Sequence, residues 1–137
     1  MPSILNPYLS FSNSARQAME FYKSVFGGEL RTMTFGEGGM PHDPSESSKV
    51  MHAQLRVPNG FVLMASDTPV SMGSARPNGA VSLSGSDETE LSGYWKKLSE
   101  GANIMAPLAK ASWGDSFGML TDKFGVAWMV NISGAGH

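Results

Sequence analysis

Apolar positions in the first half of the chain follow a strand-like pattern, then a helical one, then a strand-like pattern again. Residues 4–11 predict a strand, and Pro7 within it favours an edge position or a kink. From Ala15 the apolar residues follow helical spacing until Gly27 and Gly28 end the helix. Three further strands are predicted at residues 29–35, 50–57 and 61–66.

Alternation along residues 50–57 predicts which side chains share a face. One face carries Val50, His52, Gln54 and Arg56, and the other carries Met51, Ala53, Leu55 and Val57. The dipeptide Asn59-Gly60 then predicts a hairpin to the next strand.

The second half of the chain repeats this order. A strand at residues 79–85 is followed by a helix up to Gly101 and a strand at 103–108. A shift of about 73 residues superposes Phe21, Tyr22, Lys23, Val25 and Gly28 on Tyr94, Trp95, Lys96, Leu98 and Gly101. We therefore predict an α+β fold of two tandem βαβββ modules, residues 1–68 and 79–137, joined by a linker at 69–78. Bare sheet faces of the two modules would together form a curved mixed sheet around a shared cavity, in one compact domain.

Residues 113–132 predict the final hairpin, around which the rest of the chain is organised. Its first arm is 113–122 and its second arm is 126–132, with Gly125 supplying the positive φ of the turn. The second arm is so apolar that it needs cover on both faces.

Two helix starts and one irregular segment are also predicted. Ser14 with Gln17, and Asp87 with Glu90, have capping-box spacing. Residues 36–48 are rich in Gly, Pro and Ser, which predicts a loop or lid without a regular element.

Composition excludes several classes of function. Lys and Arg number 10 against 12 Asp and Glu, and no basic cluster occurs, so nucleic-acid binding is not expected. Absence of cysteine removes disulfides, thiolate nucleophiles and thiolate metal ligands. Neither a signal peptide nor a run of roughly 20 apolar residues is present, which predicts a soluble cytoplasmic protein without membrane contact. Ten methionines suit an adaptable cavity as well as an ordinary core.

Nearly the whole chain resembles the vicinal oxygen chelate superfamily, also known as the glyoxalase, bleomycin resistance and dioxygenase superfamily. Within it the chain is similar to the PhnB-like branch, which is sometimes labelled as related to a demethylubiquinone methyltransferase. The segments that carry the resemblance are NPYLSF at 6–11, the helix at 18–28 with its Phe21-Tyr22 pair, HAQL at 52–55, MASD at 64–67 and WGDSFGMLTDKFGVAWMVNI at 113–132. The resemblance implies paired βαβββ modules and, commonly, a homodimer.

Metal-dependent members of this superfamily place His, Gln or Glu ligands on the first and last strand of each module. The matching positions fall at or near Pro7, Met64, Ala80 and Met129, none of which is a usual ligand. The resemblance thus predicts a protein without the superfamily metal site and without another cofactor, although a divalent ion bound elsewhere stays open. Candidates for such binding are His42 in the predicted loop and His52 on a strand; His137 ends the sequence.

Several residues are candidates for a ligand site. His52 could act as a general acid or base beside the Gln54 amide, or could be a structural strand histidine. Trp113, Phe117 and Trp128 could form an aromatic wall or belong to the core. Met64 and Met129 would line the cavity. Asp115 is expected to be solvated, and no Arg or Lys cluster can be placed in the cavity, because Arg56 is expected to face solvent.

Two functions remain open at this point. The first is a small-molecule-binding protein without chemistry, and it is the one that the missing ligands favour. The second is a lyase, isomerase or dioxygenase that uses His52 or His42, with or without a metal ion. Sequence identifies neither the ligand nor the dimer geometry.

Overall fold

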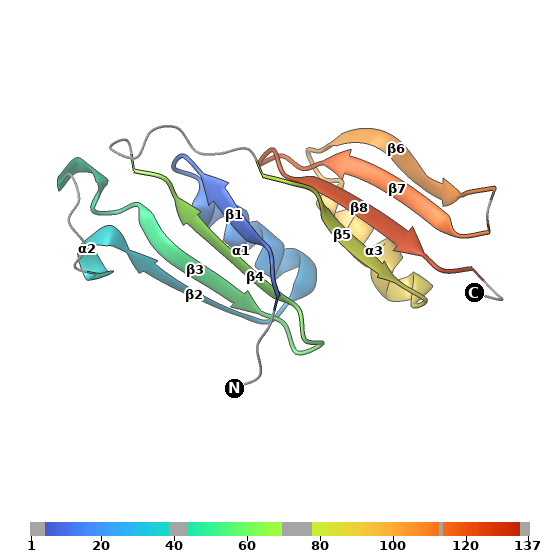
Figure 1. The fold of residues 1–137 in the computed structure, drawn as a ribbon, viewed down its shortest axis with the longest axis horizontal. Coiled ribbons are helices and arrows are strands. Elements are labelled where there is room, and N and C mark those ends of the chain that lie inside the picture. Colours follow the sequence, from blue (N-terminus) through green and yellow to red (C-terminus); the bar gives the residue numbers. More distant parts are fainter. Residues whose placement is uncertain (1–4, 39–43, 70–77, 113, 135–137) are drawn as a thin grey trace. The chain divides into compact units, whose positions relative to one another are not determined.

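Two compact units make up the chain, Met1–Pro77 and Asn78–His137. The structure is a computed structural model, which describes residues 5–38, 44–69, 78–112 and 114–134. Each unit holds a four-stranded mixed sheet with a helix on one of its faces (Figure 1). The predicted α+β class and the two βαβββ modules are confirmed. The predicted linker at 69–78 lies almost entirely outside the described residues.

The first unit carries four strands and a long helix, with two short helical turns inserted before the third strand. Its elements are β1 (Tyr8–Phe11), α1 (Ala15–Phe26), β2 (Glu29–Thr34), α2 (Phe35–Gly38), the 3₁₀ turn η1 (Pro44–Glu46), β3 (Val50–Arg56) and β4 (Val62–Asp67). The strand order is β1-β4-β3-β2, with β1 parallel to β4 and the other pairs antiparallel. The strand that follows Pro7 is therefore at a sheet edge, as predicted.

The second unit repeats this topology. Its elements are β5 (Val81–Gly85), α3 (Glu88–Leu98), β6 (Asn103–Lys110), β7 (Ser116–Thr121) and β8 (Ala127–Ile132), with the strand order β5-β8-β7-β6. The β7–β8 hairpin is the one that the sequence predicts, and Gly125 in its turn has φ +86°. Among the described residues no helix has the length and apolar character that a membrane crossing requires.

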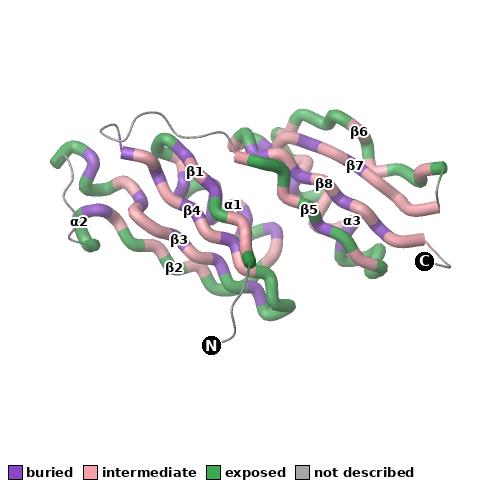
Figure 2. The backbone as a smooth tube through the Cα atoms, in the orientation of Figure 1, coloured by how far each residue is buried: buried purple, intermediate pink, exposed green. Residues whose placement is uncertain are grey.

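Side chains that alternate between buried and half-buried explain how each sheet packs on its helix (Figure 2). In the first unit the buried face of α1 contains Met19, Tyr22 and Val25, and it lies against buried β3 residues Ala53 and Leu55. Fully burying an aliphatic or aromatic side chain of this size stabilises a fold by about 1.5–3 kcal/mol, so this layer holds the unit together.

In the second unit a glycine makes room for the helix. Leu91 and Leu98 of α3 are buried, and Trp95 lies over Gly118 of β7. A Cβ atom at Gly118 would lie 2.8 Å from Cη2 of Trp95 and 2.9 Å from Cα of Leu108. Glycine is therefore required at this strand position by close approach, not by backbone conformation.

One prediction about β3 is wrong at its first residue. Met33 pairs with His52 and Thr34 with Val50, so Met51 is an extra residue in β3 and forms a bulge. The bulge turns Val50 to the helix side of the sheet, where it is 1% exposed. Val50 therefore does not share the face of His52, Gln54 and Arg56.

The cap predicted at Ser14 is also wrong, whereas the cap predicted at Asp87 is confirmed. Asp87 caps α3 by accepting a hydrogen bond from the Glu90 backbone nitrogen at 3.0 Å. Ser14 makes no side-chain hydrogen bond to the start of α1. A carboxylate distant in the sequence does so instead, as described below.

The segment predicted to lack regular structure contains short helical turns. Thr34 and Glu37 form a reciprocal pair: the Thr34 backbone nitrogen donates to Glu37 Oε1 at 3.0 Å, and the Glu37 backbone nitrogen donates to Thr34 Oγ1 at 3.2 Å. This is a capping box for α2, and its Thr-x-x-Glu spacing is visible in the sequence. Residues 39–43 of the same segment lie outside the described residues.

Candidate functional site

Each sheet has one face that its own helix leaves uncovered, and most of the predicted site residues lie there. In the first sheet, Ala53 and Leu55 face α1, so alternation places His52, Gln54 and Arg56 on the opposite face. We call this surface the first helix-free face. It carries Tyr8 and Ser10 of β1, Glu29, Arg31 and Met33 of β2, His52, Gln54 and Arg56 of β3, and Val62, Met64 and Ser66 of β4.

His52 lies beside Tyr8 on this face. The Tyr8 hydroxyl oxygen is 3.5 Å from His52 Nδ1, and the two ring centroids are 6.0 Å apart. Tyr8 is 50% exposed and His52 is half-buried, so both groups can meet a small molecule on the sheet. A phenol next to an imidazole provides a hydrogen-bonding pair that can also exchange a proton.

A polar hollow lies next to this pair, between β2 and β3. It has a volume of about 370 Å³ and is lined by Glu29, Arg31, Gln54 and Arg56. Arg31 Nε forms an ion pair with Glu29 Oε1 at 2.9 Å. The Gln54 amide, oriented with its oxygen towards Arg56, accepts from Nε at 2.6 Å and from Nη2 at 3.2 Å.

Two arginines contribute to this hollow, and Arg56 is exposed to solvent, as expected. Arg31 and Arg56 are on neighbouring strands. In the register of β2 and β3, Glu29 is opposite Arg56 and Arg31 is opposite Gln54. The sequence does indicate that Glu29, Arg31 and Met33 share one face of their strand, because they alternate along it. What the sequence did not provide was the register between residues 29–34 and 50–56, which brings the two guanidinium groups to the same face.

In the second sheet the helix-free face is more apolar. Gly118 and Leu120 are buried against α3, so Phe117 and Met119 of β7 lie on the opposite face, together with Met129 of β8, which pairs with Met119. We call this surface the second helix-free face. Its flexible thioethers and its aromatic ring are half-buried and fit a ligand of irregular apolar shape.

Trp128 lies on the other side of that sheet. It is 1% exposed, and its indole nitrogen donates to Asp122 Oδ2 at 2.9 Å. Asp122 Oδ1 also accepts from the backbone nitrogens of Phe124 and Val126, which fixes the β7–β8 turn. Of the two interpretations open for Trp128, the geometry supports a core residue. Trp113, His42 and His137 lie outside the described residues.

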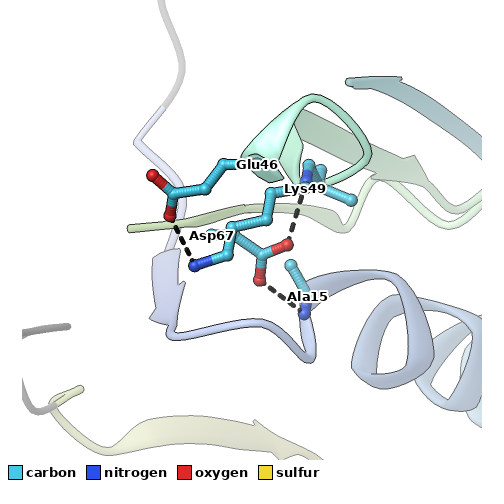
Figure 3. Close-up of polar contacts among 5 residues, drawn as sticks. Ala15, Glu46, Lys49 and Asp67 are labelled. Carbon is cyan, nitrogen blue, oxygen red and sulfur yellow. Dashed lines mark hydrogen bonds and ion pairs between the residues drawn. The ribbon is translucent and has the colours of Figure 1, made fainter. Parts of the chain in front are cut away.

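Two other acidic residues, Asp67 and Asp115, have structural roles. Asp67 is 4% exposed and accepts from the Ala15 backbone nitrogen at 3.0 Å and from the Val50 backbone nitrogen at 2.9 Å (Figure 3). Asp115, expected to be solvated, accepts from Asn131 Nδ2 at 3.1 Å and from the Gly134 backbone nitrogen at 3.0 Å. Both carboxylates hold backbone segments in place.

A buried ion pair lies near Asp67 and belongs to the same structural cluster. Lys49 Nζ is 2.8 Å from Glu46 Oε2, and the Glu46 side chain is 7% exposed (Figure 3). The pair links η1 to the residue that precedes β3. Its charges neutralise each other.

The residues at the expected metal positions do not fit a metal site of the superfamily type. Met64 and Met129 lie on the helix-free faces, where they present thioether sulfurs, which are poor ligands for hard or borderline divalent ions. Among the described residues, no three His, Cys, Asp or Glu side chains lie close enough together to share one ion.

The repeated βαβββ topology defines a class of protein. A glyoxalase, bleomycin resistance and dioxygenase domain from a Frankia species superposes with a TM-score of 0.65 at 16% identity, covering all of this chain and 96% of that one. The chain thus has the glyoxalase fold. It belongs to the family described as 3-demethylubiquinone-9 3-methyltransferase, the PhnB-like branch, whose model matches residues 3–131.

Three relatives show how similar the chain is to individual proteins of known sequence or structure. Protein YjdN of Escherichia coli is 31% identical over 93% of this chain and 94% of its own length. The crystal structure of PA1353 from Pseudomonas aeruginosa has a TM-score of 0.79 at 36% identity, covering 96% of this chain and 98% of that one. A PhnB protein from Bacillus cereus, titled a putative 3-demethylubiquinone-9 3-methyltransferase, has a TM-score of 0.73 at 25% identity, covering 96% and 100%.

Proposed function

We propose that this chain is a binding protein for a small molecule, and that the first helix-free face forms a principal part of its site. The observation that carries the proposal is the chemistry of that face. Polar groups at Tyr8, His52 and Gln54 lie beside the thioethers of Met33 and Met64, which face away from α1. A few placed polar groups among apolar side chains are the usual composition of a ligand site.

Exposure of these side chains supports the proposal. Tyr8 is 50% exposed and Met33 is 44% exposed. The fold itself does not need large apolar groups at these positions, because the core lies on the α1 side of the sheet. Covering them with a ligand would remove apolar surface from water at about 25 cal/mol per Å². We include Phe117 and Met129 of the second helix-free face in the same proposal, as a further surface that contacts a ligand.

Methionine methyl groups provide a direct test. The chain would be labelled in its methionine methyl groups and titrated with a panel of small aromatic and aliphatic compounds while NMR signals are followed. The family's description names methyl transfer to a demethylubiquinone, so the panel includes a short-chain demethylubiquinone and S-adenosylmethionine. Signals of Met33 and Met64 should move with saturation.

Met19 is the internal control for this titration. It lies on α1 and is fully buried on the other side of the first sheet. A compound that binds the helix-free face should leave Met19 almost unmoved. If every compound that shifts Met64 shifts Met19 equally, or if none shifts Met64, the chain does not bind ligands at this face.

We also propose that the chain forms a homodimer. Each sheet ends in edge strands, β1 and β2 in the first and β5 and β6 in the second, and an edge strand has unpaired backbone groups that can meet another chain. We expect a homodimer by sedimentation equilibrium across a range of concentrations. A monomer at all of them contradicts this part. The cytoplasmic location stays a prediction.

The contact between Tyr8 and His52 favours one alternative, an enzyme of the glyoxalase fold in which His52 moves a proton. The imidazole lies on the same face as the proposed ligand, with a hydroxyl 3.5 Å from Nδ1. His52→Ala should then abolish turnover of any substrate found in the titration, while Tyr8→Phe should reduce it less. Turnover that survives His52→Ala intact excludes this role for His52.

A further inference from the structure

The hollow between β2 and β3 has an excess of positive charge that its own residues do not balance. Arg31 and Arg56 each carry one positive charge, and Glu29 is the single acid among the four lining residues. Glu29 pairs with Arg31 at 2.9 Å. The positive charge of Arg56, on β3, is therefore not balanced by an acid among these four residues.

Both guanidinium groups make hydrogen bonds to other residues of the hollow. With its amide oxygen turned towards Arg56, Gln54 accepts from two nitrogens of Arg56, Nε and Nη2. Glu29 occupies Nε of Arg31. A guanidinium has five N–H donors, so each arginine retains donors beyond those used here, in the planar fork that binds carboxylate and phosphoryl oxygens in pairs.

The hollow is also continuous with the rest of the first helix-free face. Gln54 pairs across the sheet with Met64, and Met64 pairs with Tyr8. A single small molecule can therefore place a charged end against the arginines and a less polar end along the thioether and the phenol. Exposure of the Arg31 side chain, at 82%, leaves the charged end accessible from solvent.

We propose that Arg31 and Arg56 select ligands that carry an oxyanion, either a carboxylate or a phosphoryl group, with Gln54 positioning Arg56. This inference rests on the proposed function and narrows it from a small molecule to an anionic one. Arg31 and Arg56 make the contacts to the oxyanion, whereas Gln54 acts through its bonds to Arg56.

Titration of the full chain with inorganic phosphate and with succinate, at constant ionic strength, tests the proposal. Amide NMR signals of residues 29–33 and 54–56 should shift with saturation for at least one of the two. Arg31→Gln and Arg56→Gln should each weaken the binding of that anion about tenfold, the effect of losing one charge-assisted hydrogen-bonding group. Which anion binds more tightly distinguishes a phosphoryl from a carboxylate ligand.

Lys23→Gln is the matched control. It removes the same charge from the same unit, and Lys23 is an exposed residue of α1, away from the helix-free face. It should leave the affinity within about twofold of the parent chain, since α1 packs on the opposite face of the sheet and Lys23 makes no contact in the hollow. Equal losses in Lys23→Gln and in the arginine variants would show a general charge effect and overturn the proposal.

A neutral probe separates this inference from the proposed function. Menadione, an uncharged quinone, should shift the Met33 and Met64 methyl signals in Arg31→Gln and Arg56→Gln as it does in the parent chain. Menadione binding without any anion binding leaves the proposed function standing and overturns the anion selectivity. Anion binding that neither arginine variant weakens overturns it as well.

Discussion

Asp67 Oδ1 lies 3.0 Å from the backbone nitrogen of Ala15, which joins the last residue of β4 to the first residue of α1. The same carboxylate accepts from the Val50 backbone nitrogen at 2.9 Å and so reaches the first residue of β3 as well (Figure 3). Three elements of the first unit are thus fixed by one buried side chain. This is the cap that Ser14 does not provide.

Asp67→Ala should therefore lower the free energy of unfolding strongly. It leaves two buried backbone donors without an acceptor, and hydrogen bonds to a charged group contribute about 1.5–3 kcal/mol each, so we expect a loss of about 3 kcal/mol or more. Asp87→Ala, which removes the exposed cap of α3, should cost only about 1 kcal/mol. Urea denaturation followed by circular dichroism measures both. Equal losses would mean that Asp67 acts only as an ordinary helix cap.

Trp128→Phe should destabilise the second unit without changing ligand binding. The substitution removes the hydrogen bond from the indole to Asp122 and leaves a gap in the core, which together cost about 2–4 kcal/mol. Phe117→Leu, on the second helix-free face, should cost less stability and should alter ligand affinity. A Trp128→Phe chain with normal stability and impaired ligand binding would indicate that Trp128 contacts the ligand.

Gly118→Ala should also destabilise the second unit, because the added methyl group meets Trp95 and the Leu108 backbone. Overpacking of this kind costs about 1–3 kcal/mol. Gly93 offers the matched control, since it lies within α3 and a Cβ there contacts nothing within 4 Å. Gly93→Ala should stabilise the chain by up to about 1 kcal/mol, the difference in helix propensity. Thermal unfolding of the two variants should move in opposite directions.

Glu37 predicts one pH dependence. The pKa of its carboxyl lies below the ordinary 4.5, chiefly because it accepts hydrogen bonds from the Thr34 backbone nitrogen and hydroxyl. Folding therefore favours the ionised form. Its contribution to stability is present above the unfolded pKa and is lost as the pH falls through the lowered folded pKa.

Amide NMR of Thr34 during acid titration measures this pH dependence. The Thr34 amide signal should follow the protonation of Glu37 with a midpoint below 4.5, and that transition should vanish in Glu37→Gln. Glu20→Gln, a substitution on the exposed side of α1, should leave it unchanged. A Thr34 midpoint at or above 4.5 contradicts the argument.

Most of the fold could be predicted from patterns within short stretches of sequence. Helical spacing from Ala15, the turn at Gly60 and the hairpin around Gly125 are local signals, and each is present in the structure. The bulge at Met51 and the cap from Asp67 could not be predicted in the same way. Both depend on how distant strands align, and a single sequence contains no direct record of that alignment.

The site was predicted less completely, for the same reason. Alternation along residues 50–56 correctly grouped His52 with Gln54 and Arg56. It gave no sign that Arg31 lies across from Gln54, so the charge of the hollow was missed. Burial stayed undecided where one residue type suits two places: Trp128 could have lined a cavity, whereas its bond to Asp122 places it in the core.

The repeated strand order has a consequence for how the protein can change. Since each unit has its own core between sheet and helix, the two helix-free faces can accept substitutions with little effect on folding. The first face carries the charged groups of the hollow and the second carries Phe117, Met119 and Met129, on the same backbone plan. Duplicated architecture thus allows the binding chemistry of one half to differ from that of the other while both halves have the same topology.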